Sequence, residues 1–208
     1  MPTALYSDAP RLPEGEGLDL RSLVSAGAAG VEVEIGPGRG WFILERLEFA
    51  PGVGVVGLEI RRKWATIVDR RLAERGLGAR ARVFAEDARE VFPRLLTGSL
   101  AAVYLHFPDP WWKKRHAKRL VLTPALAREL GRALRPGGEL FVQTDVSERA
   151  EAYEALLAGE PTLEPWDAAG PRVDDNPYQA RSPRERRALA DGLPVVRLRY
   201  RRAGARRP

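Results

Sequence analysis

The fold class of this chain is decided by the segment Val31-Glu32-Val33-Glu34-Ile35-Gly36-Pro37-Gly38-Arg39-Gly40. Residues 31–35 are typical of a β-strand. Residues 36–40 form a tight glycine turn, and we expect a helix to begin at Trp41. Glycines at such a turn let the backbone come close to a ligand. The segment therefore predicts a strand, a ligand-binding loop and a helix in succession.

The glycine spacing indicates which ligand the loop binds. A dinucleotide site would have Gly-x-Gly-x-x-Gly, with the pyrophosphate at the helix N-terminus. Here the spacing is Gly-x-Gly-x-Gly, and Glu34 precedes the glycines. A carboxylate at this place suits a cationic group rather than a pyrophosphate. The loop therefore favours S-adenosylmethionine, which has an amino group and a sulfonium, and disfavours a nucleotide oxidoreductase.

Strands and helices alternate along the rest of the chain. Thr123 and Pro124 are typical of a helix start, and we expect Ser147 to cap the next helix. The expected strands are 53–58, 81–85, 100–107, 139–144, 161–166 and 195–201, and the expected helices are 61–75, 124–134 and 147–157. Strand and helix in unbroken alternation predict a parallel sheet covered on both faces. Ligands of such sheets bind beyond the carboxyl ends of the strands.

Two further acidic residues follow expected strands. Glu59 comes 23 residues after Gly36, where an acid can accept hydrogen bonds from both ribose hydroxyls. Asp87 follows the next strand, near where adenine would lie. Each acid alone could be a helix cap or a surface carboxylate, but with Glu34 they occupy three successive strand ends and predict one cofactor site. We expect Glu32 to be structural and paired with an arginine.

The run Phe107-Pro108-Asp109-Pro110-Trp111-Trp112-Lys113-Lys114-Arg115-His116-Ala117-Lys118-Arg119 suggests chemistry on a nucleic-acid base. The prolines stiffen the backbone around Asp109. Tryptophan offers a face on which a base can stack, and the cations offer phosphate contacts. The alternative is a proline-rich turn followed by a solvated basic helix. The other tryptophans, Trp41, Trp64 and Trp166, are read as packing residues, and His106 as a satisfied core histidine.

Composition and charge exclude several classes of protein. The chain has 208 residues, no cysteine and two histidines, so we expect one domain without disulfides or metal. No apolar run approaches the roughly 20 residues of a membrane span, and no secretion signal is evident, so we expect a soluble cytoplasmic protein. The net charge is +6, but residues 111–120 carry +5 and residues 172–208 carry +7. These two basic segments predict a polyanionic partner.

The motifs together resemble the bacterial tRNA (guanine-N7-)-methyltransferase family. The resemblance is carried by Glu34-Ile35-Gly-x-Gly-x-Gly, Gly57-Leu58-Glu59, Asp87-Ala88, the run 107–116 and Thr144-Asp145. It implies an α/β, Rossmann-like class I methyltransferase fold, with a mostly parallel central sheet, helices on both faces and a late antiparallel strand. It also implies methyl transfer from S-adenosylmethionine to N7 of the variable-loop guanine in tRNA.

The resemblance assigns roles residue by residue. Asp109 would be catalytic, and the cofactor would be bound by Glu34, Gly36, Gly38, Glu59, Asp87 and Asp109. The substrate would be bound by Lys113, Asp145, Ser182, Pro183, Arg184 and Glu185. The tRNA would be contacted by Lys114, Arg115, His116, Lys118 and Arg119. Ser182 stands where the family has Thr, Pro183 is less expected there, and Trp112 replaces a usual Pro.

The expected organisation is a single methyltransferase domain over 1–208. It has an N-terminal segment at 1–30 and a flexible substrate-binding loop at 167–187, and no obligatory protein partner is evident. Two alternatives stay open. A non-catalytic RNA-binding protein on a methyltransferase scaffold would lose the cofactor acids, which this chain keeps. A class I methyltransferase could act on another RNA or on a small molecule, but the basic strip beside Asp109 disfavours a small molecule.

Overall fold

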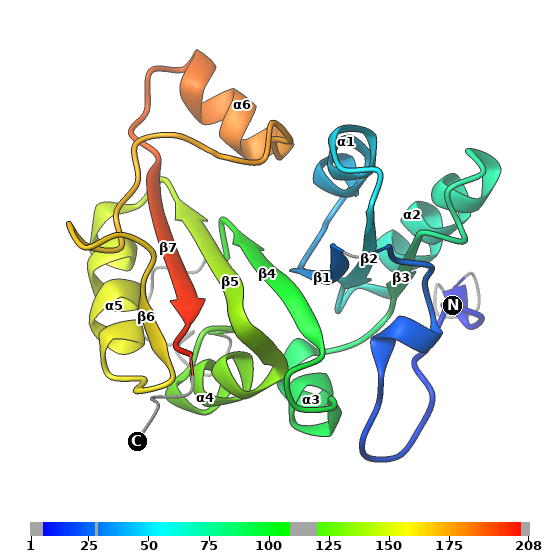
Figure 1. Ribbon diagram of the computed structural model, residues 1–208. Coiled ribbons are helices and arrows are strands. Elements are labelled where there is room, and N and C mark those ends of the chain that lie inside the picture. The colour runs from blue at the N-terminus through cyan, green and yellow to red at the C-terminus, as the bar shows by residue number, and fades with distance from the viewer. Residues whose placement is uncertain (1–5, 28, 109–119, 205–208) are drawn as a thin grey trace.

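One mixed β-sheet organises the protein, and its strands lie in the order β3-β2-β1-β4-β5-β7-β6 (Figure 1). The computed structural model describes residues 6–27, 29–108 and 120–204, and all seven strands fall within them. Strands β1 to β5 are parallel, and β7 is antiparallel to both β5 and β6. The strands are Gly30–Ile35 (β1), Val53–Leu58 (β2), Ala81–Phe84 (β3), Leu100–His106 (β4), Leu134–Thr144 (β5), Leu163–Pro165 (β6) and Val196–Arg202 (β7). The expected parallel sheet with a late antiparallel strand is confirmed.

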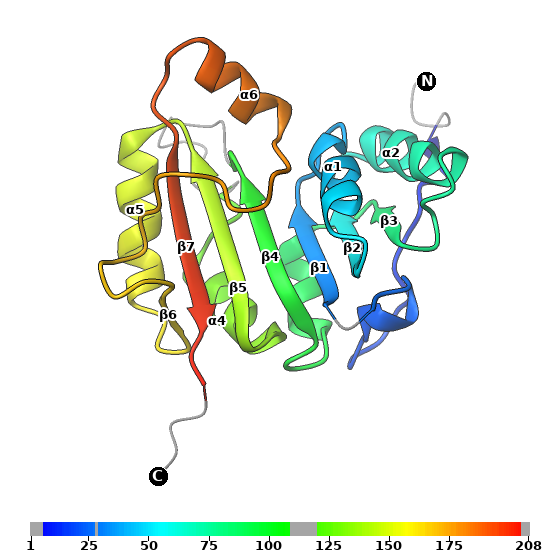
Figure 2. The ribbon, with the colours of Figure 1, turned by 45° about the horizontal axis from the view of Figure 1, so that its top comes forward.

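Helices cover both faces of the sheet (Figure 2). One face packs against α1 (Trp41–Phe49) and α2 (Arg62–Glu74). The other face packs against α3 (Ala88–Val91), the 3-10 turn η3 (Phe92–Arg94), α4 (Pro124–Ala133) and α5 (Ser147–Ala158). A second 3-10 turn, η2, spans Leu20–Ser22, and α6 spans Pro183–Ala190. The helices that connect the parallel strands thus cover both faces of the sheet, as expected for an α/β fold.

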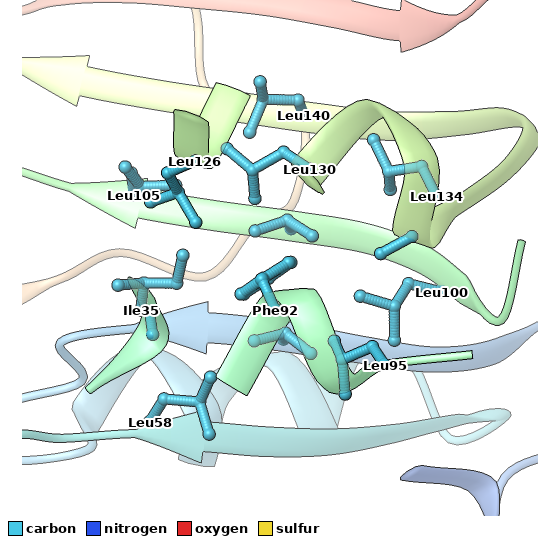
Figure 3. Packing of buried hydrophobic residues seen from close by; sticks show 14 of the residues in the cluster. Ile35, Leu58, Phe92, Leu95, Leu100, Leu105, Leu126, Leu130, Leu134 and Leu140 are labelled. Carbon is cyan, nitrogen blue, oxygen red and sulfur yellow. The ribbon is translucent and has the colours of Figure 1, made fainter. Parts of the chain in front are cut away.

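The larger core lies between the sheet and the helices of the second face (Figure 3). Apolar side chains of four neighbouring strands meet side chains of η3 and α4 there. Those that Figure 3 labels include Ile35, Leu58, Leu105, Leu140, Phe92, Leu126 and Leu130, all buried. Strand β4 is apolar along nearly its whole length because both of its faces are covered. This packing holds the carboxyl ends of β1, β4 and β5 at one rigid edge.

Helix α4 begins as the sequence predicts, whereas α5, α6 and β5 begin differently. Thr123 Oγ1 accepts a hydrogen bond from Leu126 N at 3.2 Å, and Pro124 is the first residue of α4, as expected. Ser147 does not cap α5; it is the first helical residue, and Val146 stands at the cap without a side-chain bond. The loop expected over 167–187 ends earlier, because Pro183–Ala190 is α6. Strand β5 begins at Leu134 rather than at 139, with a register shift against β4.

Candidate active site

Four of the expected ligand-binding carboxylates lie along one edge of the sheet. Glu34 is the penultimate residue of β1, and Glu59 directly follows β2. Asp87 follows β3 by three residues, and Asp145 directly follows β5. Because these four strands run parallel, their carboxyl ends share an edge. The structure therefore brings these acids to one side of the molecule, and we call them the carboxylate row.

The glycine loop joins the first two members of this row. Gly36, Gly38 and Gly40 have φ of 72°, 55° and 72°, a left-handed conformation that glycine adopts without strain. The Gly38 amide donates to Glu59 Oε2 at 3.0 Å. A Cβ added at Gly36 would meet no atom within 4 Å. The space beside Gly36 is therefore open, as close approach of a ligand to the backbone requires.

Glu59 and Asp87 are each held by the arginine two residues further along the chain. Arg61 donates its backbone amide and its Nε to Glu59 Oε1, each at 3.0 Å. Asp87 caps α3 by accepting from Arg89 N at 2.9 Å, and its carboxylate also receives the Arg89 guanidinium at 2.6 Å. The hydrogen bonds from Arg89 lower the pKa of Asp87 from its ordinary value. The capping role of Asp87 is thus observed, and its ligand role stays a prediction.

Glu34 is paired with a histidine. His106 Nδ1 lies 2.9 Å from Glu34 Oε1, and both side chains are almost fully buried. The Phe42 ring packs on the imidazole with a centroid distance of 4.2 Å. His106 Nε2 and Glu34 Oε2 have no hydrogen-bond partner in the described part of the chain. The expectation of a satisfied core histidine therefore holds for one ring nitrogen only.

Gln143 is a polar residue at this edge that the sequence reading missed. It pairs with His106 in the β4–β5 register, has no exposed surface, and neither side-chain polar atom has a hydrogen-bond partner among the described residues. Buried polar atoms without partners are uncommon in native structures and often mark a functional site. The signal was a lone amide at the end of an apolar strand, one residue before Thr144-Asp145.

The backbone at the end of β4 has an unusual conformation. Phe107 has a φ of 50°, which is rare for an aromatic residue, and its amide donates to Gln143 O at 2.8 Å. Such positions concentrate at functional sites. The residues predicted to be catalytic, to bind the substrate guanine or to contact RNA follow directly after this position. Those predictions lie outside the described residues: Asp109, Lys113, Lys114, Arg115, His116, Lys118 and Arg119.

Glu32 has the structural role expected of it. Its carboxylate accepts from Arg46 at 2.7 and 2.8 Å and from the Tyr104 hydroxyl at 2.9 Å. Tyr104 is fully buried, and this burial raises the pKa of its hydroxyl well above the ordinary value. The cluster fixes α1 against the sheet, and Glu32 lies two residues before Glu34 in the same strand.

The element Ser182 to Glu185 builds the start of α6. Ser182 Oγ accepts from Glu185 N at 3.2 Å, and Pro183 occupies the first helical turn. Arg184 forms an ion pair with Asp145, which joins α6 to the carboxylate row. Glu185 points away from solvent instead, with no exposed surface.

The Glu185 carboxylate is fully occupied by protein groups. Glu185 Oε1 accepts from Arg197 Nη2 at 3.1 Å, and Oε2 accepts from Asn176 Nδ2 at 2.9 Å. Of the element Ser182 to Glu185, Arg184 is thus the residue that the structure brings to the carboxylate row, through Asp145. Glu185 anchors this helix from within the protein.

The described residues form neither a membrane-spanning helix nor a metal-binding cluster. None of the helices there is long and apolar enough to cross a membrane. No group of three or more His, Cys, Asp or Glu residues in that part of the chain could hold a metal ion.

Solved structures with the same architecture include several methyltransferases. The 16S rRNA methyltransferase KamB matches with a TM-score of 0.62 at 16% identity, covering 94% of this chain and 98% of that one. An S-adenosylmethionine-dependent O-methyltransferase from Thermotoga maritima matches with a TM-score of 0.55 at 16% identity, covering 91% and 65%. At such identities the likeness concerns the fold, which is that of class I methyltransferases.

Sequence relatives are more specific. A family model described as "Putative methyltransferase" matches residues 28–198. The tRNA (guanine-N(7)-)-methyltransferase of Myxococcus xanthus is 42% identical over 170 residues, covering 81% of this chain and 82% of that protein. The enzyme of the same name from Anaeromyxobacter dehalogenans is 40% identical over 184 residues, covering 87% and 90%. This chain therefore belongs to the tRNA (guanine-N(7)-)-methyltransferase family.

Proposed function

We propose that this protein transfers a methyl group from S-adenosylmethionine to N7 of the variable-loop guanine in tRNA. The observation that carries the proposal is the carboxylate row at the carboxyl edge of a class I methyltransferase sheet. Family membership supports the same reaction, because the relatives are tRNA (guanine-N(7)-)-methyltransferases.

The cofactor would lie along the first three members of the row. The Glu34 oxygen that has no hydrogen-bond partner would accept from the amino group of the cofactor. The open space beside Gly36 would let the cofactor approach the backbone, and an added Cβ at Gly38 would meet only Arg61 Nη2, at 3.9 Å. Glu59 would bind the ribose, and Asp87 would lie near the adenine. The Arg61 side chain is 62% exposed, so it can move into solvent when ribose hydroxyls replace its bonds to the buried Glu59 carboxylate. When bound, the cofactor supplies an electrophilic methyl group on its sulfonium.

The protein's own residues would align and stabilise rather than remove a proton. Guanine N7 has a free lone pair, so the main task is to hold N7 in line with the methyl group. The guanine gains positive charge in the transition state, and nearby carboxylates stabilise it. We assign this role to Asp109 and assign substrate binding to Lys113 and Asp145. Asp145 would accept from guanine N–H groups after its ion pair with Arg184 opens.

The remaining substrate-binding residues would act beside Asp145. Ser182, Pro183 and Arg184 form the first turn of α6 beside Asp145. Glu185 would hold that turn in place through Arg197. A direct base contact by Glu185 would require breaking this buried pair. The strip Lys114, Arg115, His116, Lys118 and Arg119 would contact the tRNA backbone.

Labelled cofactor and a defined tRNA test the proposal. The protein is incubated with methyl-labelled S-adenosylmethionine and a tRNA with guanine in the variable loop, and the labelled nucleotide is mapped. The matched substrate has 7-deazaguanine at that position, which removes N7 and keeps the Watson–Crick edge. We expect label at this guanine only, and none in the 7-deaza tRNA or with Asp109→Ala. Label at another nucleotide would indicate a different RNA specificity, and tRNA binding without cofactor binding would indicate a non-catalytic protein.

A further inference from the structure

The positive charge of the C-terminal segment is largely compensated within the protein. Eight of the nine described arginines in residues 172–204 form ion pairs with acidic residues, and Arg202 donates to backbone carbonyls instead. The paired arginines are Arg172, Arg181, Arg184, Arg186, Arg187, Arg197, Arg199 and Arg201. The charge pattern of the sequence predicts that this segment is one of two regions that bind a polyanion. Its pairing pattern shows that most of this charge already has an internal partner.

Cations without acidic partners gather instead on α2 and the glycine loop. In the glycine loop, along α2 and at its C-cap, six cations form no ion pair with a described residue: Arg39, Arg62, Lys63, Arg70, Arg71 and Arg75. An α-helix turns about 100° per residue, so Arg62, Lys63 and Arg70 fall within an arc of about 100° on one face of α2, whereas Arg71 lies at the side of that arc. All of the six are exposed except Arg71, which is half-buried.

The acidic residues of α2 do not neutralise this face. Asp69 is bound to Arg82 of β3 at 2.9 Å. Glu74 lies in the last turn and forms no ion pair with a described residue. The face therefore carries more cations than acids, and none of these cations forms an ion pair with a described residue.

Two tryptophans lie within this cluster. Arg71 lies over the Trp41 ring at 5.9 Å, and Arg39 lies over the Trp64 ring at 5.3 Å. Arg71 Nη1 also donates to Arg39 O at 2.9 Å, and Trp41 is 43% exposed. The expectation that Trp41 is a packing residue is therefore wrong. We call the set Arg39, Trp41, Arg62, Lys63, Trp64, Arg70 and Arg71 the α2 patch.

The α2 patch lies beside the site. Arg39 belongs to the glycine loop, Trp41 is the first residue of α1, and α2 begins three residues after Glu59. Figures 1 and 2 show α1, α2 and α6 along the same side of the molecule. An RNA that placed a base at the carboxylate row could therefore extend over this patch. Proteins commonly bind the phosphates of a nucleic acid with cations and stack its bases on exposed aromatic rings.

We propose that the α2 patch is a tRNA-binding surface distinct from the segment 113–119 and from the C-terminal arginines. Arg62, Lys63 and Arg70 would contact phosphates, and Trp41 would stack on an unpaired base or pack on a ribose. This inference rests on the proposed function, because it takes tRNA as the polyanion.

Two charge-matched double variants test the patch. Arg62→Gln with Arg70→Gln removes two unpaired cations. The control, Arg172→Gln with Arg201→Gln, removes two arginines of similar exposure that are already ion-paired. Binding of tRNA is measured by fluorescence anisotropy over a range of salt concentrations. In the patch variant we expect affinity to fall on the order of tenfold and the slope of log K against log salt to decrease by roughly two. The control should keep both values near wild type.

The outcomes separate this inference from the proposed function. Equal losses in the two double variants would show a general charge effect and overturn the inference, as would an unchanged slope in the patch variant. Trp41→Ala should weaken binding with an unchanged slope, because no charge is removed. Binding of S-adenosylmethionine by calorimetry should be the same in all variants. If wild type binds tRNA but adds no methyl group, the proposed function fails while the patch can still be judged by the salt slopes.

Discussion

The buried imidazole of His106 holds one oxygen of the Glu34 carboxylate, at a distance of 2.9 Å. An ionised carboxylate only accepts hydrogen bonds, so His106 Nδ1 must be the donor. The two side chains are 3% and 2% exposed, and Glu34 Oε2 has no partner within the described residues. The pair therefore leaves one buried oxygen of the Glu34 carboxylate without a hydrogen-bond partner.

Replacing His106 should weaken cofactor binding through Glu34. His106→Leu removes the donor and leaves the buried Glu34 carboxylate without a hydrogen-bond partner, so the carboxylate is no longer held in position. We expect the Kd for S-adenosylmethionine, measured by calorimetry, to rise about tenfold. His106→Asn is the matched variant, because its side-chain amide can donate from a position close to that of Nδ1, and it should recover most of the affinity. Equal affinity of the Leu variant and wild type would contradict this role for His106.

Asp145 should affect the tRNA step without affecting the cofactor. Asp145→Asn removes the charge that we assign to the substrate guanine, and we expect the KM for tRNA to rise roughly tenfold. The Kd for S-adenosylmethionine should stay unchanged. Asp191→Asn is the control, because Asp191 also pairs with an arginine of α6, Arg187 at 2.7 Å, at the other end of the helix. A similar rise in KM in both variants would indicate that the helix, and not the Asp145 carboxylate, is responsible.

The sequence predicted the sheet and the position of the carboxylate row because both depend on local patterns. Apolar strands, glycine turns and acids at strand ends are visible along the chain, and Glu32 was correctly expected to have an arginine partner. The pairings of Asp145 with Arg184 and of Glu185 with Arg197 could not be predicted. They join segments far apart in the chain, and an arginine-rich segment offers many equivalent partners.

The start of α6 could have been predicted from Ser182 to Glu185, the element that the family resemblance assigns to substrate binding. Ser182 and Glu185 have the spacing of a helix N-cap and its third residue, and Pro183 suits the first turn. The surrounding Pro, Asp, Gly and Arg residues favoured a loop instead. The unpartnered atoms of Gln143 and His106 were beyond the sequence, because burial and hydrogen-bond partners depend on the packed structure.

Breaking the Glu185–Arg197 pair should destabilise the fold. Glu185→Gln leaves the Arg197 guanidinium, which is 6% exposed, without a counter-charge. Loss of one partner of a buried pair costs about 3 kcal/mol, and we expect the free energy of unfolding by urea to fall by that amount. The control is Glu164→Gln, whose pair with Arg201 is 45% exposed on both sides and should cost less than about 1 kcal/mol. Equal losses would contradict an anchoring role for Glu185.

Asp87 should make stability depend on acid pH. The bonds from Arg89 lower the pKa of Asp87 in the folded protein from its ordinary value of 3.8. A group with a lowered folded pKa stabilises above its unfolded pKa, and this contribution is lost as the pH falls through the folded pKa. Asp87→Asn keeps a helix-capping side chain but removes the charge. We expect wild type to be more stable than this variant at neutral pH, and the difference to vanish at acid pH. A difference that stays constant with pH would show that the charge is not its source.

Gly40 and Gly36 should respond differently to the same substitution. Both have a φ of 72°, so alanine is strained at either position by about 1 kcal/mol. At Gly40 the added Cβ would also lie 2.3 Å from Val68 Cγ1, where α1 packs against α2. At Gly36 it would meet no atom within 4 Å. Overpacking adds about 1–3 kcal/mol, so we expect Gly40→Ala to lower the free energy of unfolding by roughly 3 kcal/mol and Gly36→Ala by roughly 1 kcal/mol. Equal losses in urea unfolding would mean that the backbone conformation alone requires glycine at position 40.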